Sequence, residues 1–310
     1  MIEVRELSKV YPGGVEAVKG IDFDVGAGEV FGLLGPNGAG KSTTIGMLTT
    51  TVRPTGGTAR LGGFDVAREP LAARRVSSVV FQEPVVDRTL SGRRNLEIHA
   101  RLWGVEANAS RERIADAAQA FGLLELLDRQ AGSYSGGERR RLEIARALVS
   151  HPRVLFLDEP TVGLDPRIRE ELLDVIAGLR ERGTLTILLT THYLDEAERL
   201  CDRIAVLHAG RIVALDSPAR LRNGLGRELV ELRVRKDASV ALSSLRARGI
   251  AGEDAFAIGS KLTVPLRDLT AAAAISAINE LNLATAISAR QPTLDDVYLR
   301  LTGDSLAAAA

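Results

Sequence analysis

A glycine-rich segment near the start of the chain has the residue types and the spacing of a phosphate-binding loop, GxxxxGK[ST]. An apolar run at residues 29–34 precedes it, and a helical pattern follows from about Ser42. Glycines let successive backbone N–H groups turn inward around a polyphosphate, and a helix N-terminus adds partial positive charge. We expect Lys41 to place a positive charge near the β- and γ-phosphates and the Ser42 hydroxyl to ligate Mg²⁺. The predicted nucleotide-binding residues of this segment are Gly35, Pro36, Asn37, Gly38, Ala39, Gly40, Lys41, Ser42 and Thr43.

Two acidic residues stand at the end of a later apolar run. Asp158 and Glu159 follow residues 154–157, which are all apolar, as in a central parallel strand. From that position Asp158 is expected to reach Mg²⁺ through its water shell, and Glu159 is expected to polarise an attacking water as general base. Either acid alone would be interpreted as an exposed carboxylate at a strand end, but the phosphate loop favours the catalytic interpretation.

A second loop of small residues, Ser135, Gly136 and Gly137, precedes a helical pattern at residues 139–148. A helix N-terminus of this kind is a second anion site. Because the two loops lie far apart in one chain, we expect the second loop to serve the nucleotide of another molecule.

Five segments occur in the order of an ABC-type ATPase cassette, which the chain resembles over about residues 1–220. They are the phosphate loop, YSGGE at 134–138, LFLDEP at 155–160, GLDP at 163–166, and Thr191-His192. The resemblance implies ATP and Mg²⁺ as ligands. It also implies an α/β fold with a parallel core sheet, an antiparallel β flank and a helical subdomain at about residues 88–150.

The resemblance also implies roles for single residues. Tyr11 would stack on adenine, Gln82 would touch Mg²⁺ and the attacking water, and Asp165 would link two nucleotide sites. His192 would be the switch histidine that hydrogen-bonds the γ-phosphate, and residues 135–137 would contact that phosphate across a head-to-tail dimer. Without the resemblance, Tyr11 is interpreted as a core residue and His192 as a structural one.

Residue 138 departs from the family pattern, because Glu138 stands where the signature commonly has Gln. An acid near a phosphate is unfavourable unless it points away. The arginine run that follows, residues 139–141, is predicted to be a solvated helix face.

The pattern of elements predicts the two-domain organisation that a chain of 310 residues accommodates. Short β-rich and helical runs alternate up to about residue 222, and Ala209-Gly210 reads as a hairpin turn. A short polar stretch at 218–226 marks the boundary. Residues 223–310 then follow the order βαββαβ, a ferredoxin-like α+β accessory domain, with a last helix capped by Thr293 and Asp296. The tail, residues 307–310, is predicted to be frayed.

Composition excludes several classes of protein. Lys plus Arg (40) equals Asp plus Glu (40), which argues against a nucleic-acid partner. No run of about 20 apolar residues is present, so we predict no membrane span. The single cysteine, Cys201, excludes a disulfide within the chain and lies in a helical apolar pattern that predicts burial.

The C-terminal segment QPTLDDVYL, residues 291–299, is similar to the end of daunorubicin-resistance-type ABC exporter ATPases. The resemblance implies the ATP-hydrolysing subunit of an exporter for a drug, antibiotic, lipid or polysaccharide-like substrate. Such a subunit forms a homodimer on a polytopic membrane permease, at the cytoplasmic face of the cell membrane. One alternative is a soluble, non-transport ABC ATPase of the translation or repair type. Another is a kinase with the same phosphate loop, which would not need residues 135–137 or a switch histidine.

Overall fold

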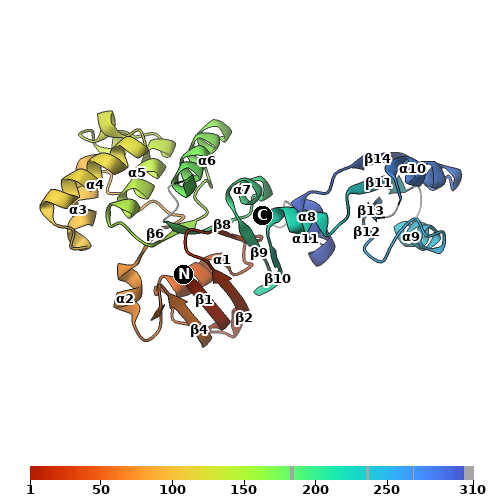
Figure 1. The fold of residues 1–310 in the computed structure, drawn as a ribbon, viewed down its shortest axis with the longest axis horizontal. Coiled ribbons are helices and arrows are strands. Elements are labelled where there is room, and N and C mark those ends of the chain that lie inside the picture. Colours follow the sequence, from red (N-terminus) through yellow and green to blue (C-terminus); the bar gives the residue numbers. More distant parts are fainter. Residues whose placement is uncertain (182–184, 235–236, 268, 304–310) are drawn as a thin grey trace. The chain divides into compact units, whose positions relative to one another are not determined.

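The structure, a computed structural model, describes residues 1–181, 185–234, 237–267 and 269–303, and forms two compact units, Met1–Val213 and Ala214–Ala310 (Figure 1). The predicted division lay between residues 222 and 223. The tail that the sequence predicts to be frayed, residues 307–310, lies outside the described residues.

A six-stranded sheet in the order β10-β9-β3-β8-β7-β6 forms the centre of the first unit. Pairing from β6 to β9 is parallel, and every residue of β3, β7 and β8 is buried, as the apolar runs predict. The register places Leu34 beside Thr191 and Asp158 beside Thr190, so the carboxyl ends of three strands meet at one edge. The strands are β3 (Val30–Leu34), β6 (Ser77–Val80), β7 (Val154–Asp158), β8 (Thr186–Thr191), β9 (Arg203–His208) and β10 (Arg211–Asp216).

A second, antiparallel sheet flanks this core, in the order β2-β1-β4-β5. Its strands are β1 (Ile2–Tyr11), β2 (Val15–Val25), β4 (Gly56–Leu61) and β5 (Phe64–Asp65). The predicted hairpin between β9 and β10 is confirmed: both of its turn residues have positive φ, 47° at Ala209 and 81° at Gly210.

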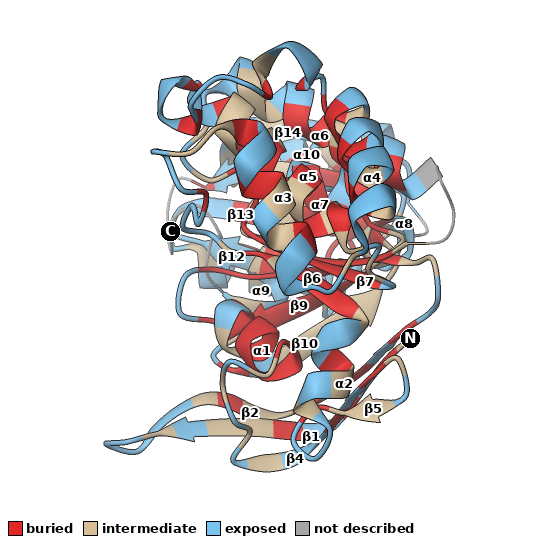
Figure 2. Cartoon of the chain, turned by 90° about the vertical axis from the view of Figure 1, so that its left-hand side faces the viewer, coloured by how far each residue is buried: buried red, intermediate tan, exposed pale blue. Residues whose placement is uncertain are grey.

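Seven α-helices and two short 3-10 helices, Leu124–Leu126 and Ala131–Ser133, complete the first unit within the described residues. The α-helices are α1 (Lys41–Leu48), α2 (Pro70–Arg75), α3 (Gly92–Leu102), α4 (Ala107–Ala120), α5 (Gly136–Val149), α6 (Pro166–Glu181) and α7 (Leu194–Leu200). Helices α3, α4 and α5 pack on one another and form the predicted helical subdomain, apart from the antiparallel sheet (Figure 1). Buried and exposed residues alternate along α3 and α4, as expected of amphipathic helices that cover a core on one side (Figure 2).

Cys201 ends α7 and is 6% exposed, as predicted. A Cβ atom added at Gly32 of β3 would lie 2.7 Å from the Cys201 sulfur, so the thiol packs directly onto the central sheet. Burial raises the pKa of this thiol well above its ordinary value.

The second unit contains an antiparallel sheet in the order β12-β13-β11-β14, with the element order βαββαβ of a split βαβ fold. Its strands are β11 (Glu228–Val234), β12 (Phe256–Ile258), β13 (Lys261–Leu266) and β14 (Ala284–Arg290). Its helices are α8 (Pro218–Asn223), α9 (Ala238–Ala247), α10 (Ala271–Glu280) and α11 (Leu294–Thr302). Leu232, Leu245 and Ile278 belong to its own apolar core.

Two helix starts in this unit follow from their capping residues. Thr293 and Asp296 form a reciprocal capping box at α11, as predicted. Residues 218–226, predicted as a polar boundary segment, instead contain α8, because Ser217 caps it and Pro218 occupies its first position.

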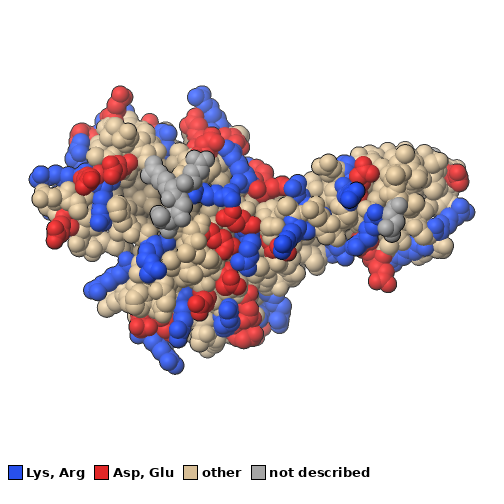
Figure 3. Space-filling view, viewed as in Figure 1, with Lys and Arg blue, Asp and Glu red and all other residues tan. Residues whose placement is uncertain are grey.

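None of the helices in the described ranges combines the length and the apolar composition needed to cross a bilayer. On the face drawn in Figure 3, basic and acidic side chains are interspersed.

Candidate nucleotide site

The phosphate loop, residues 35–42, joins β3 to α1 and needs its glycines for steric reasons. A Cβ atom at Gly35 would lie 2.4 Å from the Leu207 carbonyl oxygen, and one at Gly40 would lie 2.5 Å from that of Ala17. Gly40 also has φ of 106° and occupies the N-cap position of α1. Because Gly40 has no side chain to cap the helix, the first N–H groups of α1 are left for an anionic ligand.

Lys41 is buried and its ammonium group lies inside this loop. Nζ donates to the carbonyl oxygens of Gly35 (2.8 Å) and Pro36 (3.1 Å), and lies 2.9 Å from Oε1 of Glu159. Both side chains are almost inaccessible, 4% and 6% exposed, so water screens their attraction little. A positive charge is therefore held where the loop would receive a phosphate.

Asp158 and Ser42 bring oxygen donors together beside Lys41. Ser42 Oγ donates to Asp158 Oδ1 at 3.2 Å, and Thr190 Oγ1 donates to the same oxygen at 2.6 Å. A hydroxyl and a carboxylate are ligands that fit Mg²⁺, which usually takes one or two protein oxygens and completes its shell with water and phosphate oxygens. Accordingly, the described residues contain no cluster of three or more His, Cys, Asp or Glu side chains suited to hold a metal alone.

Glu159 lies between Lys41 and His192. Its backbone has φ of 44°, a left-handed conformation uncommon for a residue other than glycine, and its N–H donates to Thr190 Oγ1 at 2.9 Å. Its Oε2 lies 3.4 Å from Nδ1 of His192, a buried nitrogen that makes no hydrogen bond within the described part of the chain. The arrangement suits a carboxylate that accepts a proton beside a phosphate.

The second loop, residues 135–137, starts α5 and is held by a capping box. Glu138 N–H donates to Ser135 Oγ (3.2 Å), and Ser135 N–H donates to Glu138 Oε2 (2.7 Å). The carboxylate of Glu138 is therefore turned back onto its own loop, which explains how an acid is accommodated there.

This loop also packs closely on α6. A Cβ atom at Gly137 would lie 2.2 Å from Cγ2 of Ile168. Asp165 caps the helix that carries Ile168, because its Oδ1 accepts from the Ile168 N–H at 3.1 Å.

The structure brings some predicted residues together and places others apart. Lys41, Ser42, Asp158, Glu159 and His192 form one cluster at the carboxyl ends of β3, β7 and β8. The remaining predicted residues lie as follows: Tyr11 has its hydroxyl 3.4 Å from Thr43 Oγ1, Gln82 is exposed just after β6, and residues 135–137 lie on the helical subdomain.

The prediction of a solvated face for residues 139–141 is wrong for Arg140, which is 6% exposed. Its guanidinium contacts the backbone at the ends of β6 and β7. Helical spacing is the signal that would have found it, because residues 137, 140, 144 and 147 share the buried side of α5.

A second buried group that sequence reasoning missed is Glu196 of α7, 1% exposed. It accepts from Thr191 Oγ1 (2.6 Å), Arg169 Nε (2.7 Å) and Thr161 Oγ1. Glu196 therefore links the segment after β7 and the end of β8 to helix α6.

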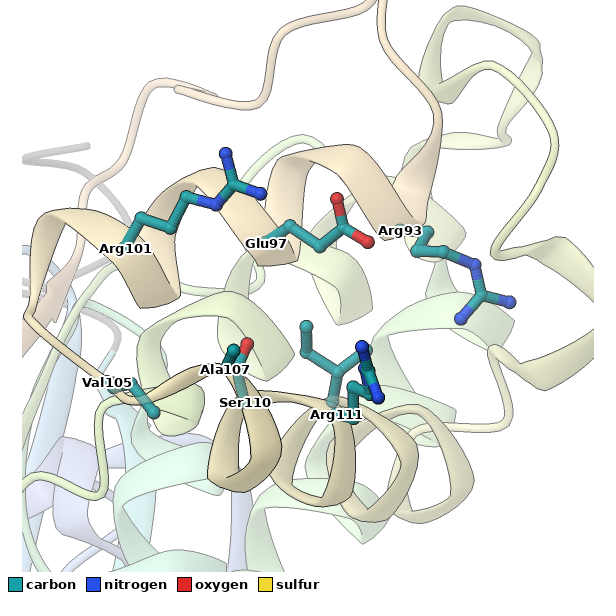
Figure 4. A pocket seen from close by; sticks show the side chains of 8 residues that line it. Arg93, Glu97, Arg101, Val105, Ala107, Ser110 and Arg111 are labelled. Atoms are coloured by element: carbon teal, nitrogen blue, oxygen red, sulfur yellow. The ribbon is translucent and has the colours of Figure 1, made fainter.

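A separate cavity of about 280 Å³ lies between α3 and α4 and contains none of the predicted site residues. Figure 4 shows Arg93 and Glu97 projecting from α3 on one side and Arg111 from α4 on the other.

Known proteins are similar to the chain over almost its whole length. The daunorubicin/doxorubicin resistance ATP-binding protein DrrA of Streptomyces peucetius is 46% identical, over 97% of this chain and 92% of the relative. The linearmycin resistance ATP-binding protein LnrL of Bacillus subtilis is 32% identical, over 99% of each chain. Among solved structures, an ATP-binding subunit of an ABC transporter is 31% identical with a TM-score of 0.65, over 73% of this chain and 93% of that one.

The family model described as ABC transporter matches residues 18–162, which include the phosphate loop, the 135–137 loop and the acids at the end of β7. The order of these segments, their convergence on one edge of a parallel sheet and the near full-length relatives agree. The chain belongs to the ATP-binding proteins of ABC transporters, within the group of daunorubicin-resistance-type ATPases.

Proposed function

We propose that this ABC ATPase energises an exporter, and that the cluster of Lys41, Asp158, Glu159 and His192 is the centre that hydrolyses ATP. The observation that carries the proposal is the Glu159 carboxylate, buried 2.9 Å from the Lys41 ammonium and 3.4 Å from His192 Nδ1. Relatives named for resistance to daunorubicin, doxorubicin and linearmycin, and for Nod factor export, support a drug, antibiotic, lipid or polysaccharide-like cargo.

In the proposed mechanism the phosphate loop binds the polyphosphate, Tyr11 stacks on adenine, and Lys41 exchanges Glu159 for the γ-phosphate. Ser42 and Asp158, with Gln82, would hold Mg²⁺, which supplies charge neutralisation at the phosphates. Released from Lys41, the Glu159 carboxylate accepts a proton from the attacking water. The oxygen of that water bonds to the γ-phosphorus as the bond to the β,γ-bridging oxygen breaks, leaving ADP and phosphate. His192 orients the γ-phosphate by a hydrogen bond.

We place the 135–137 loop against the nucleotide of a second copy of the chain. The loop lies at the N-terminus of α5 on the helical subdomain, whereas the phosphate loop lies between β3 and α1. Two copies arranged head to tail would complete two sites, and Asp165 beside the loop would link them.

Four exposed apolar side chains, one from the segment after Gln82 and three from α3 and its C-cap, form the surface that we assign to the membrane permease. They are Val85 (46% exposed), Ile98 (36%), Leu102 (74%) and Trp103 (42%). Trp103 stacks on His99, and Arg146, whose charge acts on His99, donates to the Val85 carbonyl, so His99 and Arg146 link Trp103 to Val85. A permease bound there at the cytoplasmic face of the membrane would lie next to Gln82, and thus next to the nucleotide site.

The experiment is co-expression of the chain with a candidate permease, chosen as a polytopic membrane protein from a neighbouring reading frame, followed by co-purification in detergent. We expect a stable complex with ATPase activity, and loss of the complex with Leu102→Asp while ATP binding by the chain is kept. Val240→Asp, at an exposed apolar residue of the second unit, is the matched control. Sedimentation of the chain with ribosomes and not with the membrane protein would favour the non-transport alternative.

A further inference from the structure

Arg140 of α5 is a buried cation that donates mainly to backbone carbonyl oxygens. Its Nε donates to Pro160 at 2.7 Å and its Nη1 to Phe81 at 2.6 Å. Its Nη2 reaches the carbonyl oxygens of Asp158 (3.3 Å) and Glu159 (3.4 Å). All three nitrogens of the guanidinium therefore have acceptors, as burial of a charge requires.

Glu143, one turn along α5 and 2% exposed, completes this arrangement. Its Oε2 pairs with Arg140 Nη1 at 2.8 Å, and its Oε1 accepts from the Val85 N–H at 2.9 Å. Together, Arg140 and Glu143 hold the 158–160 segment, which contains the general base, and both ends of the 81–85 segment, which contains Gln82.

The backbone held by Arg140 needs support. Glu159 has a positive φ, a conformation that persists in non-glycine residues only where the surroundings impose it. Carbonyl oxygens on both sides of this residue, those of Asp158 and Pro160, bind the same planar guanidinium. An ammonium cannot reproduce this geometry, because it is a point charge without a fixed fork of donors.

We infer that Arg140 and Glu143 are a positioning pair that ties the helix of the 135–137 loop to Glu159 and to the Gln82 segment of the same chain. The inference rests on the proposed function. When that loop meets the nucleotide of a second copy, displacement of α5 acts through Arg140 on the backbone of Glu159. Each chain thereby couples the half-site that it completes in its partner to its own general base.

The test uses the full-length chain in its complex with the permease and compares Arg140→Lys, Arg140→Met and Glu143→Gln. We expect kcat for ATP to fall about 10-fold in Arg140→Lys and about 100-fold in Arg140→Met, while KM stays within about 2-fold, because positioning acts on the transition state and not on ATP binding. Glu143→Gln is expected to lie between the wild type and Arg140→Met. Arg113→Met is the matched control: Arg113, on α4, also donates to a carbonyl, that of Val149, but contacts no site residue among its described hydrogen bonds.

A double-mutant cycle with Glu159→Gln separates positioning from a general loss of structure. If Arg140 acts through Glu159, adding Arg140→Lys to Glu159→Gln lowers the residual rate no further. Additive losses, a KM that rises as much as kcat falls, or an unchanged kcat in Arg140→Lys would each overturn the inference. If Arg140→Met fails to fold, Arg140→Lys and Glu143→Gln decide. Should Glu159→Gln itself leave turnover unchanged, it is the proposed catalytic site that fails, and the two failures are thus distinct.

Discussion

The carboxylate of Glu159 and the ammonium of Lys41 neutralise each other in a site where each is expected to act on phosphate chemistry. A buried pair of this kind is costly to break unless a new partner arrives. A nucleotide phosphate is such a partner for Lys41. In the proposed mechanism, binding of ATP and release of Glu159 would thus be one exchange of the partner of Lys41.

Glu159→Gln is therefore expected to abolish turnover without weakening ATP binding. The amide cannot accept the water proton, and it also removes a negative charge that competes with phosphate for Lys41. We expect kcat to fall at least about 100-fold, the lower end of the range for loss of a general base, and an ATP-bound dimer to accumulate. Single-turnover hydrolysis and gel filtration with ATP check this, with Glu112→Gln, at an exposed residue of α4, as a matched carboxylate-to-amide control. Turnover near the wild-type rate would exclude Glu159 as the base.

His99 links pH to stability in the helical subdomain. Burial, with a smaller contribution from the Arg146 charge, lowers the pKa of His99 from 6.5 to about 4. Unfolded His99 takes up a proton near pH 6.5 and folded His99 does not do so until about pH 4. The free energy of unfolding therefore decreases as the pH falls through this window, by up to about 3 kcal/mol from this group. His99→Phe, which keeps an aromatic ring beside Trp103, should flatten the dependence in urea titrations from pH 7 to 4. Equal slopes for both proteins would contradict the assignment.

At the residue scale the residues that meet at the site could be predicted, and the buried residues that support them could not. Lys41, Asp158 and Glu159 occur in contiguous motifs, so the residue types and their neighbours suffice. Arg140 donates hydrogen bonds to carbonyl oxygens 18 and 20 residues away in sequence, and Glu196 accepts one from a hydroxyl 35 residues away. Neither motif nor composition indicates those contacts. The helical spacing of the buried residues of α5 is the one sequence signal for Arg140, and a run of three arginines obscures it.

Helix α5 approaches helix α6 closely at Gly137. The Gly137 position leaves room for no Cβ atom, because Cγ2 of Ile168 would lie 2.2 Å away. This contact sets how closely the 135–137 loop approaches the start of α6, where Asp165 lies. Two elements that are expected to face a second copy of the chain are thereby held in one geometry.

Gly137→Ala should lower the free energy of unfolding by about 1–3 kcal/mol through overpacking and should reduce ATPase activity. Ile168→Ala removes the clashing methyl group, so the double variant should recover activity. Gly178→Ala, on α6 with no atom within 4 Å of the added Cβ, is the control and should stabilise by about 0.5–1 kcal/mol. Chemical unfolding and ATPase assays measure both effects. A double variant that recovers no ATPase activity would show that the contact does not determine the position of the 135–137 loop.

Regular elements could be predicted where the periodicity is long or the capping residues are clear. The buried strands β3 and β7 lie within two residues of the predicted apolar runs, and helix α11 begins directly after its predicted cap, Thr293. Helices α2 and α8 were not predicted, because each has six residues and starts at a proline that also suits a turn.

Buried apolar residues surround the central sheet of the first unit, and the described part of the second unit has a hydrophobic core of its own. Domains with separate cores can unfold separately. We expect two calorimetric transitions, one for each unit. ATP with Mg²⁺ should raise the free energy of unfolding of the first unit alone, by about 2.7 kcal/mol at an ATP concentration of 100 times Kd. Leu232→Ala, at a residue 1% exposed in the core of the second unit, should lower the free energy of unfolding of that unit alone, by about 2–5 kcal/mol. Transitions that shift together in both experiments would show one cooperative unit.

The thiol of Cys201 has a practical consequence for work on the whole molecule. It is the chain's only cysteine, and it is packed on Gly32 with its pKa raised, so a maleimide should not modify it while the first unit is folded. Spectroscopic labels can therefore be attached to introduced cysteines of the natural chain without first replacing Cys201. Under denaturing conditions the same thiol becomes a built-in reporter, whose labelling rate follows the opening of the cassette and is independent of events confined to the second unit.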